Sequence, residues 1–278
     1  MKNKVIVSSF HTCSVYGLEN TEHDIDNIVS LDSHIDTSIL GLRESVVNAM
    51  KDDWSIKYTA GRAGAHAFFT KVFDLFEPLT LIIPEKSLET YVVATQNHLD
   101  SLGIESSENI VEDYVNLQKE MFNIQLVTCP NKDPLAEIKK IGYDSIDVLD
   151  IDVDYFSAMQ SECYTPMKKT IPSDLGNLTR CLKIIKKVKP KTITLSEATI
   201  DALNNPNSNT NLLLKKLENL GYERENFFLF DDDKTAKENL KKWEDFDKFY
   251  NENKQCDVES DFSSADVELG NLANQFFK

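Results

Sequence analysis

Short runs of β-branched and apolar residues alternate along this chain with longer amphipathic stretches, and this alternation limits the fold more than any other feature. Such runs predict strands at 5–10, 27–32, 79–84, 122–129, 147–156, 192–198 and 227–232. Helical spacing of apolar residues, ending at glycine or proline, predicts helices at 87–103, 173–190 and 211–222. Strands that alternate with helices pair in parallel through right-handed crossovers. The sequence therefore predicts an α/β protein with a mainly parallel sheet in a three-layer α/β/α arrangement.

The 278 residues are long enough for one large α/β domain or two ordinary ones. We expect one such domain over 1–230, because neither a repeat nor a Pro/Gly-rich linker divides it. Residues 231–278 are dense in charge and poor in strand formers, which predicts an acidic helical extension packed on the same domain. The chain has only nine glycines and no Walker or G-x-G-x-x-G loop, so the nucleotide-binding classes lose support.

The charge balance restricts the partners of the chain. With 46 acidic and 30 basic residues, the formal charge is −16, which argues against a nucleic-acid partner and favours a neutral or cationic small-molecule substrate. The number of cysteines is odd, and their spacing is not that of a short metal motif. We expect a cytoplasmic protein without a membrane span, whose thiols serve as small buried hydrophobes.

Two of the predicted strands carry ionisable residues at alternate positions. These are Asp32, His34 and Asp36 in one segment and Asp150, Asp152 and Asp154 in the other. Alternate residues of an extended chain share a face, and carboxylates held there without a counter-charge would repel one another. Arginine is scarce, with four in the chain. Because a divalent cation needs deprotonated oxygen donors, it is the simplest partner for these acids.

The same segments carry a resemblance to a known family. "SLDSHID" (30–36) resembles the D-A-H-x-D segment of the arginase/agmatinase/histone-deacetylase superfamily, and "LDIDVD" (149–154) is similar to its L-S-F-D-x-D element. The family pattern adds a histidine after the first strand, where this chain has His11. It also adds a glutamate at the end of a later strand, where "TITLSEATI" supplies Glu197. The resemblance extends over roughly residues 5–200 and implies an arginase-like fold.

What the resemblance implies is a centre with two divalent metal ions. One ion would be bound by His11, Asp32, Asp36 and Asp152, and the other by Asp32, His34, Asp152 and Asp154. Asp32 and Asp152 would therefore bridge the two ions. Mostly oxygen donors with two imidazoles suit Mn²⁺ better than tetrahedral Zn²⁺. Asp150 would orient the ligands from behind, or replace Asp154 if the strand register differs by two.

The implied chemistry is hydrolysis of a C–N bond in a guanidino or amidine-type substrate. Two ions about 3.5–4 Å apart can share a water and lower its pKa, which gives a hydroxide nucleophile. Asp36 would accept a hydrogen bond from that hydroxide, and Glu197 would meet the cationic end of the substrate. His66 would then protonate the departing amine as a general acid.

The chain also departs from the ureohydrolase pattern. Tyr155, Phe156 and Ser157 follow Asp154 where the family continues D-x-D-x-x-D-P, and Glu197 lies in S-E-A-T-I-D where the family has E-x-N-P. "SSFH" replaces the glycine-rich G-G-D-H. These departures indicate an outlying arginase-like branch and leave two alternatives open, a one-metal amidohydrolase of deacetylase type and a metal-binding protein without turnover. The resemblance also leaves a homo-oligomer open, since members of the superfamily often assemble.

Overall fold

The computed structural model describes the chain in separate ranges. These are residues 2–9, 14, 17–18, 21, 24–32, 78–101, 108–129, 134–142, 146–156, 175–196, 198, 200–227 and 229. Within them the strands are β1 (Lys4–Val7), β2 (Ile28–Leu31), β3 (Leu79–Ile83), β4 (Ile124–Thr128), β5 (Val148–Asp152), β6 (Thr192–Ser196) and β7 (Glu223–Asn226). The helices are α5 (Glu85–Ser101), α6 (Ile110–Phe122), α7 (Pro134–Ile141), α8 (Leu175–Val188), α9 (Ile200–Asn204) and α10 (Asn209–Asn219), with a 3₁₀ turn, η1 (Val153–Phe156).

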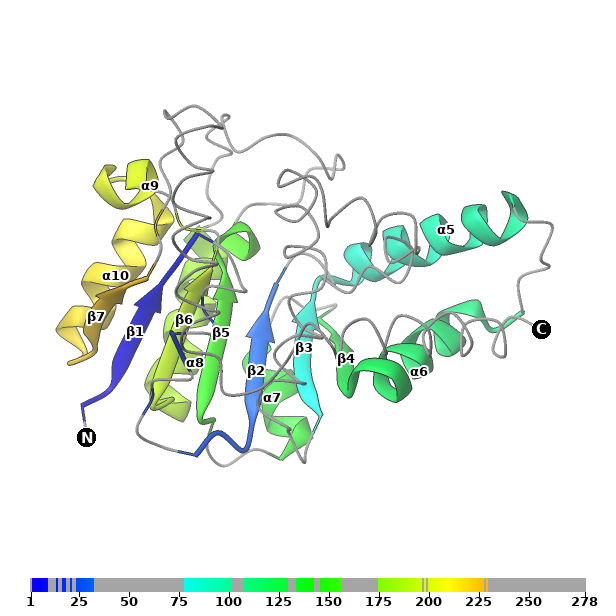
Figure 1. Cartoon of the computed structure of the whole chain (residues 1–278), viewed down its shortest axis with the longest axis horizontal. Coiled ribbons are helices and arrows are strands. Elements are labelled where there is room, and N and C mark those ends of the chain that lie inside the picture. The colour runs from blue at the N-terminus through cyan, green and yellow to red at the C-terminus, as the bar shows by residue number, and fades with distance from the viewer. Residues whose placement is uncertain are drawn as a thin grey trace, which may run out of the picture.

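The strands of these ranges form one seven-stranded sheet in the order β4-β3-β2-β5-β6-β1-β7 (Figure 1). Every neighbouring pair in this sheet is parallel. Helices lie between successive strands from β3 onward, as parallel pairing requires. The prediction of an α/β fold built on a parallel sheet is therefore confirmed.

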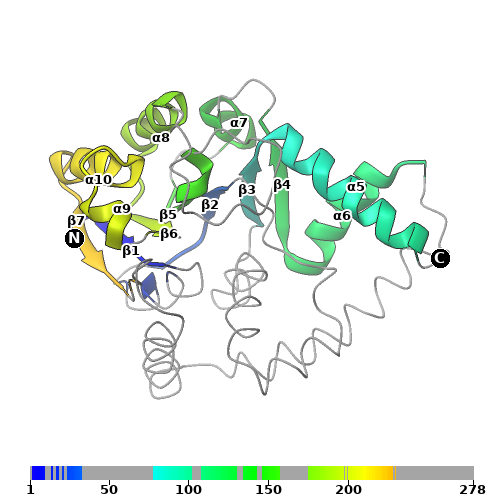
Figure 2. The same cartoon turned by 90° about the horizontal axis from the view of Figure 1, so that it is seen from above.

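The helices α7, α8 and α10 lie side by side along one face of the sheet (Figure 2). They belong to the connections β4–β5, β5–β6 and β6–β7, which all run across the sheet in the same direction. Right-handed crossovers in one direction bring their helices to one face, which explains this row. Helices α5 and α6 lie at the β4 end of the sheet (Figures 1 and 2).

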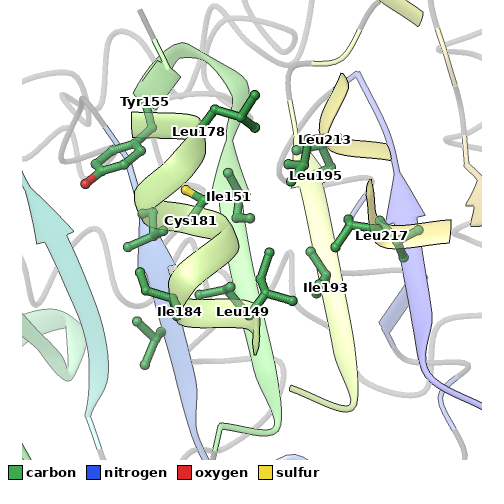
Figure 3. Packing of buried hydrophobic residues seen from close by; sticks show 14 of the residues in the cluster. Leu149, Ile151, Tyr155, Leu178, Cys181, Ile184, Ile193, Leu195, Leu213 and Leu217 are labelled. Carbon is green, nitrogen blue, oxygen red and sulfur yellow. The ribbon is translucent and has the colours of Figure 1, made fainter. Parts of the chain in front are cut away.

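The hydrophobic core lies between this row of helices and the central strands (Figure 3). Leu149 and Ile151 of β5 contact the face of α8 that carries Cys181 and Ile184, while β6 packs against α10 in the same way. Burial of each large apolar side chain contributes about 1.5–3 kcal/mol. Burial also raises the pKa of the Cys181 thiol far above its ordinary value, so this cysteine is a core hydrophobe, as expected from the sequence.

Two of the strand predictions need correction. The strand predicted at 147–156 ends at Asp152, because Val153–Phe156 turns into the 3₁₀ helix η1. Asp154 therefore does not continue the strand face that Asp150 and Asp152 share. The last described strand is Glu223–Asn226; of the strand predicted at 227–232, only residues 227 and 229 are described, and neither lies in a strand.

The strand Glu223–Asn226 was not predicted from the sequence because its side chains are charged or polar and exposed. β7 forms the edge of the sheet and pairs through its backbone with β1, so it buries no apolar face. Its glutamates instead form ion pairs with two lysines: Glu223 pairs with Lys2, two residues before β1, and Glu225 pairs with Lys4 of β1 at 3.6 Å. Helices α6, α7 and α9 were not predicted from the sequence.

Residues 33–77, 157–174 and 230–278 lie outside the described residues. The acidic extension predicted at 231–278 falls among them. No helix within the described ranges is both long and apolar enough to span a membrane.

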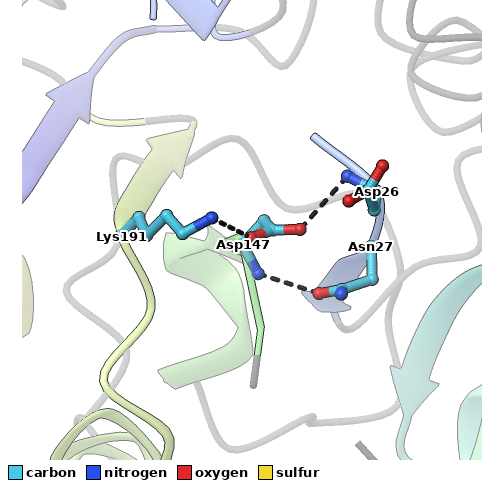
Figure 4. A network of polar contacts seen from close by, with 4 residues as sticks. All are labelled: Asp26, Asn27, Asp147 and Lys191. Atoms are coloured by element: carbon cyan, nitrogen blue, oxygen red, sulfur yellow. Dashed lines mark hydrogen bonds and ion pairs between the residues drawn. The ribbon is translucent and has the colours of Figure 1, made fainter. Parts of the chain in front are cut away.

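A polar network holds the amino ends of β2, β5 and β6 together (Figure 4). Asp147, directly before β5, accepts a hydrogen bond from Lys191 Nζ at 2.7 Å and another from the backbone N–H of Asp26 at 3.1 Å. Its own N–H donates to Asn27 Oδ1 at 2.8 Å. This buried carboxylate therefore has a cation and a backbone donor as partners, and it lies at the opposite end of β5 from Asp152.

The ion pair of Lys191 with Asp147 is expected to stabilise the fold only while the lysine is protonated. The hydrogen bond to Asp147 raises the pKa of Lys191 above its ordinary value of 10.5, against a smaller lowering by burial. Because the pKa is raised in the folded state, the contribution of this ion pair to stability is complete below pH 10.5. It is lost as the pH rises through the folded-state pKa of Lys191.

Because the Lys191 side chain is 55% exposed, Lys191→Gln should lower the free energy of unfolding by no more than about 1 kcal/mol at about pH 8. The free energies of unfolding of the variant and the wild type, measured by urea titration, should become equal at pH values above the folded-state pKa of Lys191. A difference that persists there would mean that the lysine acts through packing and not through its charge.

Candidate metal centre

Asp32 and Asp152 lie next to each other at the carboxyl edge of the sheet. The parallel register pairs Leu31 with Ile151, so the next step along both strands brings Asp32 beside Asp152. The N–H of Asp32 donates to Ile82 O at 3.3 Å, which extends the ladder of β2 by one residue. Both side chains are buried, with 0% and 2% of their surface exposed. Neighbouring strands are about 4.7–4.9 Å apart, so two carboxylates share one small buried volume.

The two aspartates also lie where the topology opens a crevice. The connection after β2 leads to β3 on one side, and the connection after β5 leads to β6 on the other side. Adjacent parallel strands whose connections leave in opposite directions form a topological switch point, and ligands of open α/β sheets bind at the carboxyl ends of such strands. The described residues thus place this pair of acids at the position where an α/β sheet most often binds a ligand.

Asp150 lies on the same strand face, one pleat below Asp152, and is held by hydroxyl groups of both neighbouring strands. Ser30 Oγ of β2 donates to Asp150 Oδ2 at 2.7 Å. From β6, Thr194 Oγ1 donates to Asp150 Oδ1 at 2.5 Å, and Ser196 Oγ makes a longer contact of 3.4 Å with the same oxygen. All four side chains are fully buried. Asp150 is therefore part of a polar layer directly beneath the row of Asp32 and Asp152.

The polar layer continues towards β1 through two further serines. Ser14 Oγ lies 2.9 Å from Ser196 Oγ and 2.5 Å from Ser8 Oγ. Ser8 and Ser14 are also fully buried. Hydroxyl groups from β2, β6, the end of β1 and the segment after β1 thus form one buried network around Asp150.

The chain after β1 is fixed against the same edge of the sheet. Ser9 Oγ donates to the carbonyl of Ala198 at 2.8 Å, and the N–H of Ala198 donates to Ser8 O at 3.0 Å. Farther along, a Cβ added at Gly17 would lie only 2.8 Å from Cγ2 of Ile6, so glycine permits a close approach to the strand. These contacts join the residues just after β1 to those just after β6.

Part of the predicted site lies outside the described residues. These predicted residues are His11, His34, Asp36, His66 and Glu197. Asp154 is placed in η1, but its side chain is not described. Among the described side chains, no group of three or more His, Cys, Asp or Glu residues could hold a metal ion. The structure therefore brings together Asp32 and Asp152, with Asp150 beneath them.

The sheet order nevertheless relates the predicted residues outside the described ranges to this pair. The predicted ligand and substrate segments follow β1, β2, β5 and β6, and these four strands are consecutive in the sheet as β2-β5-β6-β1. His11 lies in the sequence between the anchored residues Ser9 and Ser14, and Glu197 lies between Ser196 and Ala198. None of this adjacency follows from the sequence order, in which β3 and β4 separate β2 from β5.

The hydroxyl network was missed from the sequence, although a signal for it exists. Serine or threonine alternates with leucine in "SLD" (30–32) and "TLS" (194–196), just as aspartate alternates with isoleucine in "DID" (150–152). In strands that are buried on both faces, polar residues at alternate positions predict a polar layer on one face. The rule that predicts a shared face for the carboxylates therefore applies to these hydroxyls as well.

Comparisons of the chain with family models, with curated proteins and with solved structures give no match.

Proposed function

We propose that this chain is a hydrolase with two divalent metal ions, Mn²⁺ rather than Zn²⁺, and an arginase-like three-layer fold. It cleaves a C–N bond of a small guanidino or amidine-type molecule. The proposal rests on one observation above all, the burial of Asp32 and Asp152 side by side at the switch point of a parallel sheet.

The chemistry of the described donors fits a hard divalent cation. Two carboxylates held together in a buried volume repel each other unless a positive charge lies between them. Carboxylate oxygens are the donors that Mn²⁺ and Mg²⁺ prefer, and the thiols of Cys129 and Cys181 lie among core residues instead.

The polar layer beneath the pair supports the same assignment. Ligating carboxylates need partners that fix their orientation, and Asp150 with its hydroxyl donors supplies a rigid floor of that kind. By contrast, Asp147 at the other end of β5 is matched with Lys191. The acid before β5 thus contacts a protein cation, and we propose that Asp152 at the carboxyl end of β5 contacts metal ions.

In this proposal Asp154 of η1 and residues outside the described ranges complete the centre. His11, His34, Asp36 and Asp154 supply the remaining ligands, Asp36 also accepts a hydrogen bond from the attacking water, and Glu197 holds the cationic end of the substrate. His66 donates the proton that the departing amine needs. When bound, the two ions would activate the water and polarise the substrate. The net charge of −16 favours the approach of a cationic substrate.

Metal analysis of the purified protein followed by turnover assays tests this function. We expect two equivalents of Mn per chain, and release of urea or ammonia from at least one member of a panel of guanidines and amidines. Asp32→Asn should abolish turnover, whereas Asp147→Asn, a change of a buried acid at the amino edge, should preserve it.

Other outcomes would overturn the proposal. One equivalent of Zn, with acetate released from N-acetylated amines, would indicate the deacetylase-type alternative. Two bound ions without turnover of any panel member would indicate a metal-binding protein. A protein that binds no divalent ion would exclude all three assignments.

A further inference from the structure

We propose that a stripe of lysines on the outer face of α8 docks onto an acidic stripe on α5 of a second copy of this chain. The inference is independent of the proposed function, because neither stripe includes a residue assigned to the metal centre. It follows from the charge, the exposure and the helical spacing of described side chains.

The helix row α7, α8 and α10 has a charge opposite to that of the chain as a whole. The chain carries 46 acidic and 30 basic residues. Helix α8, however, has an arginine and three lysines and no acidic residue. Helices α7 and α10 each add two adjacent lysines (139–140 and 215–216) and a single glutamate. The outer side of this row is therefore a basic surface on an acidic protein.

The lysines of α8 point away from the sheet. Cys181 and Ile184 are buried against the central strands (Figure 3), whereas Lys183, Lys186 and Lys187 are exposed. Residues three and four positions apart lie on one face of a helix, so these three lysines form one row. We call them the lysine stripe. It contains no aromatic or apolar residue that could enter a bilayer or stack on a base, which leaves charge as the means of recognition.

Helix α5 carries the complementary pattern. Its exposed side chains include Glu85, Glu89, Val93, Gln96 and Asp100, which recur every three or four residues and so share one face. We call these five residues the acidic stripe. Val93 lies in the middle of the acidic stripe with 54% of its surface exposed. The stripe thus offers carboxylates at both ends and an apolar side chain between them.

The two stripes lie on different parts of one molecule. Helix α5 is at the β4 end of the sheet, and α7 lies between α5 and α8 (Figure 2). A contact between the lysine stripe and the acidic stripe therefore joins two molecules.

The chemistry of the two stripes fits such a contact. The ammonium groups of the lysine stripe can pair with the carboxylates, while the aliphatic stems of the lysines cover Val93. A nucleic acid or an anionic membrane would meet the negative charge of the remaining surface with more negative charge. A second copy instead presents both signs of charge. Exposed ion pairs are individually weak and are screened by salt, so we expect a weak and salt-dependent association.

Sedimentation velocity of the full chain at increasing protein concentration tests this inference. At about 0.05 M salt the wild type should sediment faster as its concentration rises, because molecules associate. At about 1 M salt, where the Debye length is about 3 Å, it should sediment as a monomer at every concentration. Association that is equally strong at both salt concentrations would contradict a contact between charged stripes.

Two double variants identify the surfaces. Lys183→Gln with Lys187→Gln, and Glu89→Gln with Asp100→Asn, should each raise the dissociation constant by about 2- to 30-fold, as expected for the loss of two exposed ion pairs. A mixture of the two variants keeps one intact stripe of each kind. Heterodimers should therefore form in the mixture with a dissociation constant close to that of the wild type. All four positions are exposed, so urea unfolding should be unchanged.

Lys2→Gln with Lys4→Gln is the matched control. It changes the net charge by the same amount as the variant of the lysine stripe, at lysine side chains that are 75% and 39% exposed and lie beside β7. Its association should equal that of the wild type. An equal loss in this control would mean that net charge and not the lysine stripe governs association, and the inference would be wrong.

Three further results would overturn the inference. The first is a wild type that remains monomeric at low salt, and the second is association that neither double variant weakens. The third is a mixture of the two variants that associates no better than each variant by itself. If the monomeric wild type instead bound duplex DNA or vesicles of anionic lipid through Lys183 and Lys187, the lysine stripe would serve a polyanion and not a second copy.

Discussion

Asp152→Ala is expected to remove both metal ions, and Asp32→Ala is expected to do the same. Each residue is proposed to bridge the two ions, so neither metal position survives the loss of either side chain. Elemental analysis of dialysed protein should fall from two equivalents of Mn to none, and turnover should fall to the background rate. Full metal content in either variant would refute the assignment of these two aspartates.

Replacement of Asp152 by asparagine should leave a distinct signature in stability. Binding of Mn²⁺ to the wild type should raise its free energy of unfolding by about 2.7 kcal/mol at a metal concentration of 100 times the dissociation constant. The isosteric Asp152→Asn variant should show no such rise. Without metal, this variant should be at least as stable as the wild type, because one of two neighbouring buried carboxylates has been replaced by a neutral group.

Asp147→Asn is the control that distinguishes loss of a metal ligand from loss of a buried acid with a structural role. Asp147 is buried and lies directly before the same strand, but its carboxylate is matched with Lys191. Its replacement should lower stability equally with and without Mn²⁺ and leave the metal content at the wild-type level. An Asp152→Asn variant that behaves in this way would place Asp152 among the structural acids.

The sequence was sufficient to predict the class of fold, because alternating strand and helix patterns permit little other than a parallel sheet. The order of the strands in the sheet could not be predicted from the sequence. Ser30 and Asp150 are 120 positions apart and still share a hydrogen bond, since the chain forms β3 and β4 on one side before it returns to place β5 beside β2. The pairing of Asp32 with Asp152 depends on this return, which no local pattern encodes.

Local patterns also failed where the chain context decides the structure. Val153 and Tyr155 are good strand formers, yet they lie in the 3₁₀ turn η1, because the parallel ladder ends at Asp152. At β7 the opposite error occurred. Four exposed polar residues form a strand there, because pairing with β1 requires backbone groups and not apolar side chains.

Asp150→Ala is expected to destabilise the protein strongly, whether or not metal is bound. Ser30 and Thr194 donate to this carboxylate at 2.7 and 2.5 Å, and each hydrogen bond to a charged group is worth about 1.5–3 kcal/mol. Loss of both therefore predicts a decrease of about 3–6 kcal/mol in the free energy of unfolding, a large share of the roughly 5–15 kcal/mol that holds a typical protein folded. Urea unfolding of the metal-free protein measures it directly.

Asp150 and Asp152 are thus two buried acids on one face of one strand with opposite expected effects in the metal-free protein. Removal of Asp150 leaves the hydroxyl groups of Ser30 and Thr194 without their acceptor. Removal of the charge at Asp152 instead relieves repulsion from Asp32. A decrease below about 1 kcal/mol for Asp150→Ala would mean that the hydroxyls find other partners, and the network would then be too weak to orient a metal centre. A large decrease for Asp150→Ala, with none for Asp152→Asn, would show that Asp150 contributes to the stability of the fold, whereas the charge of Asp152 does not.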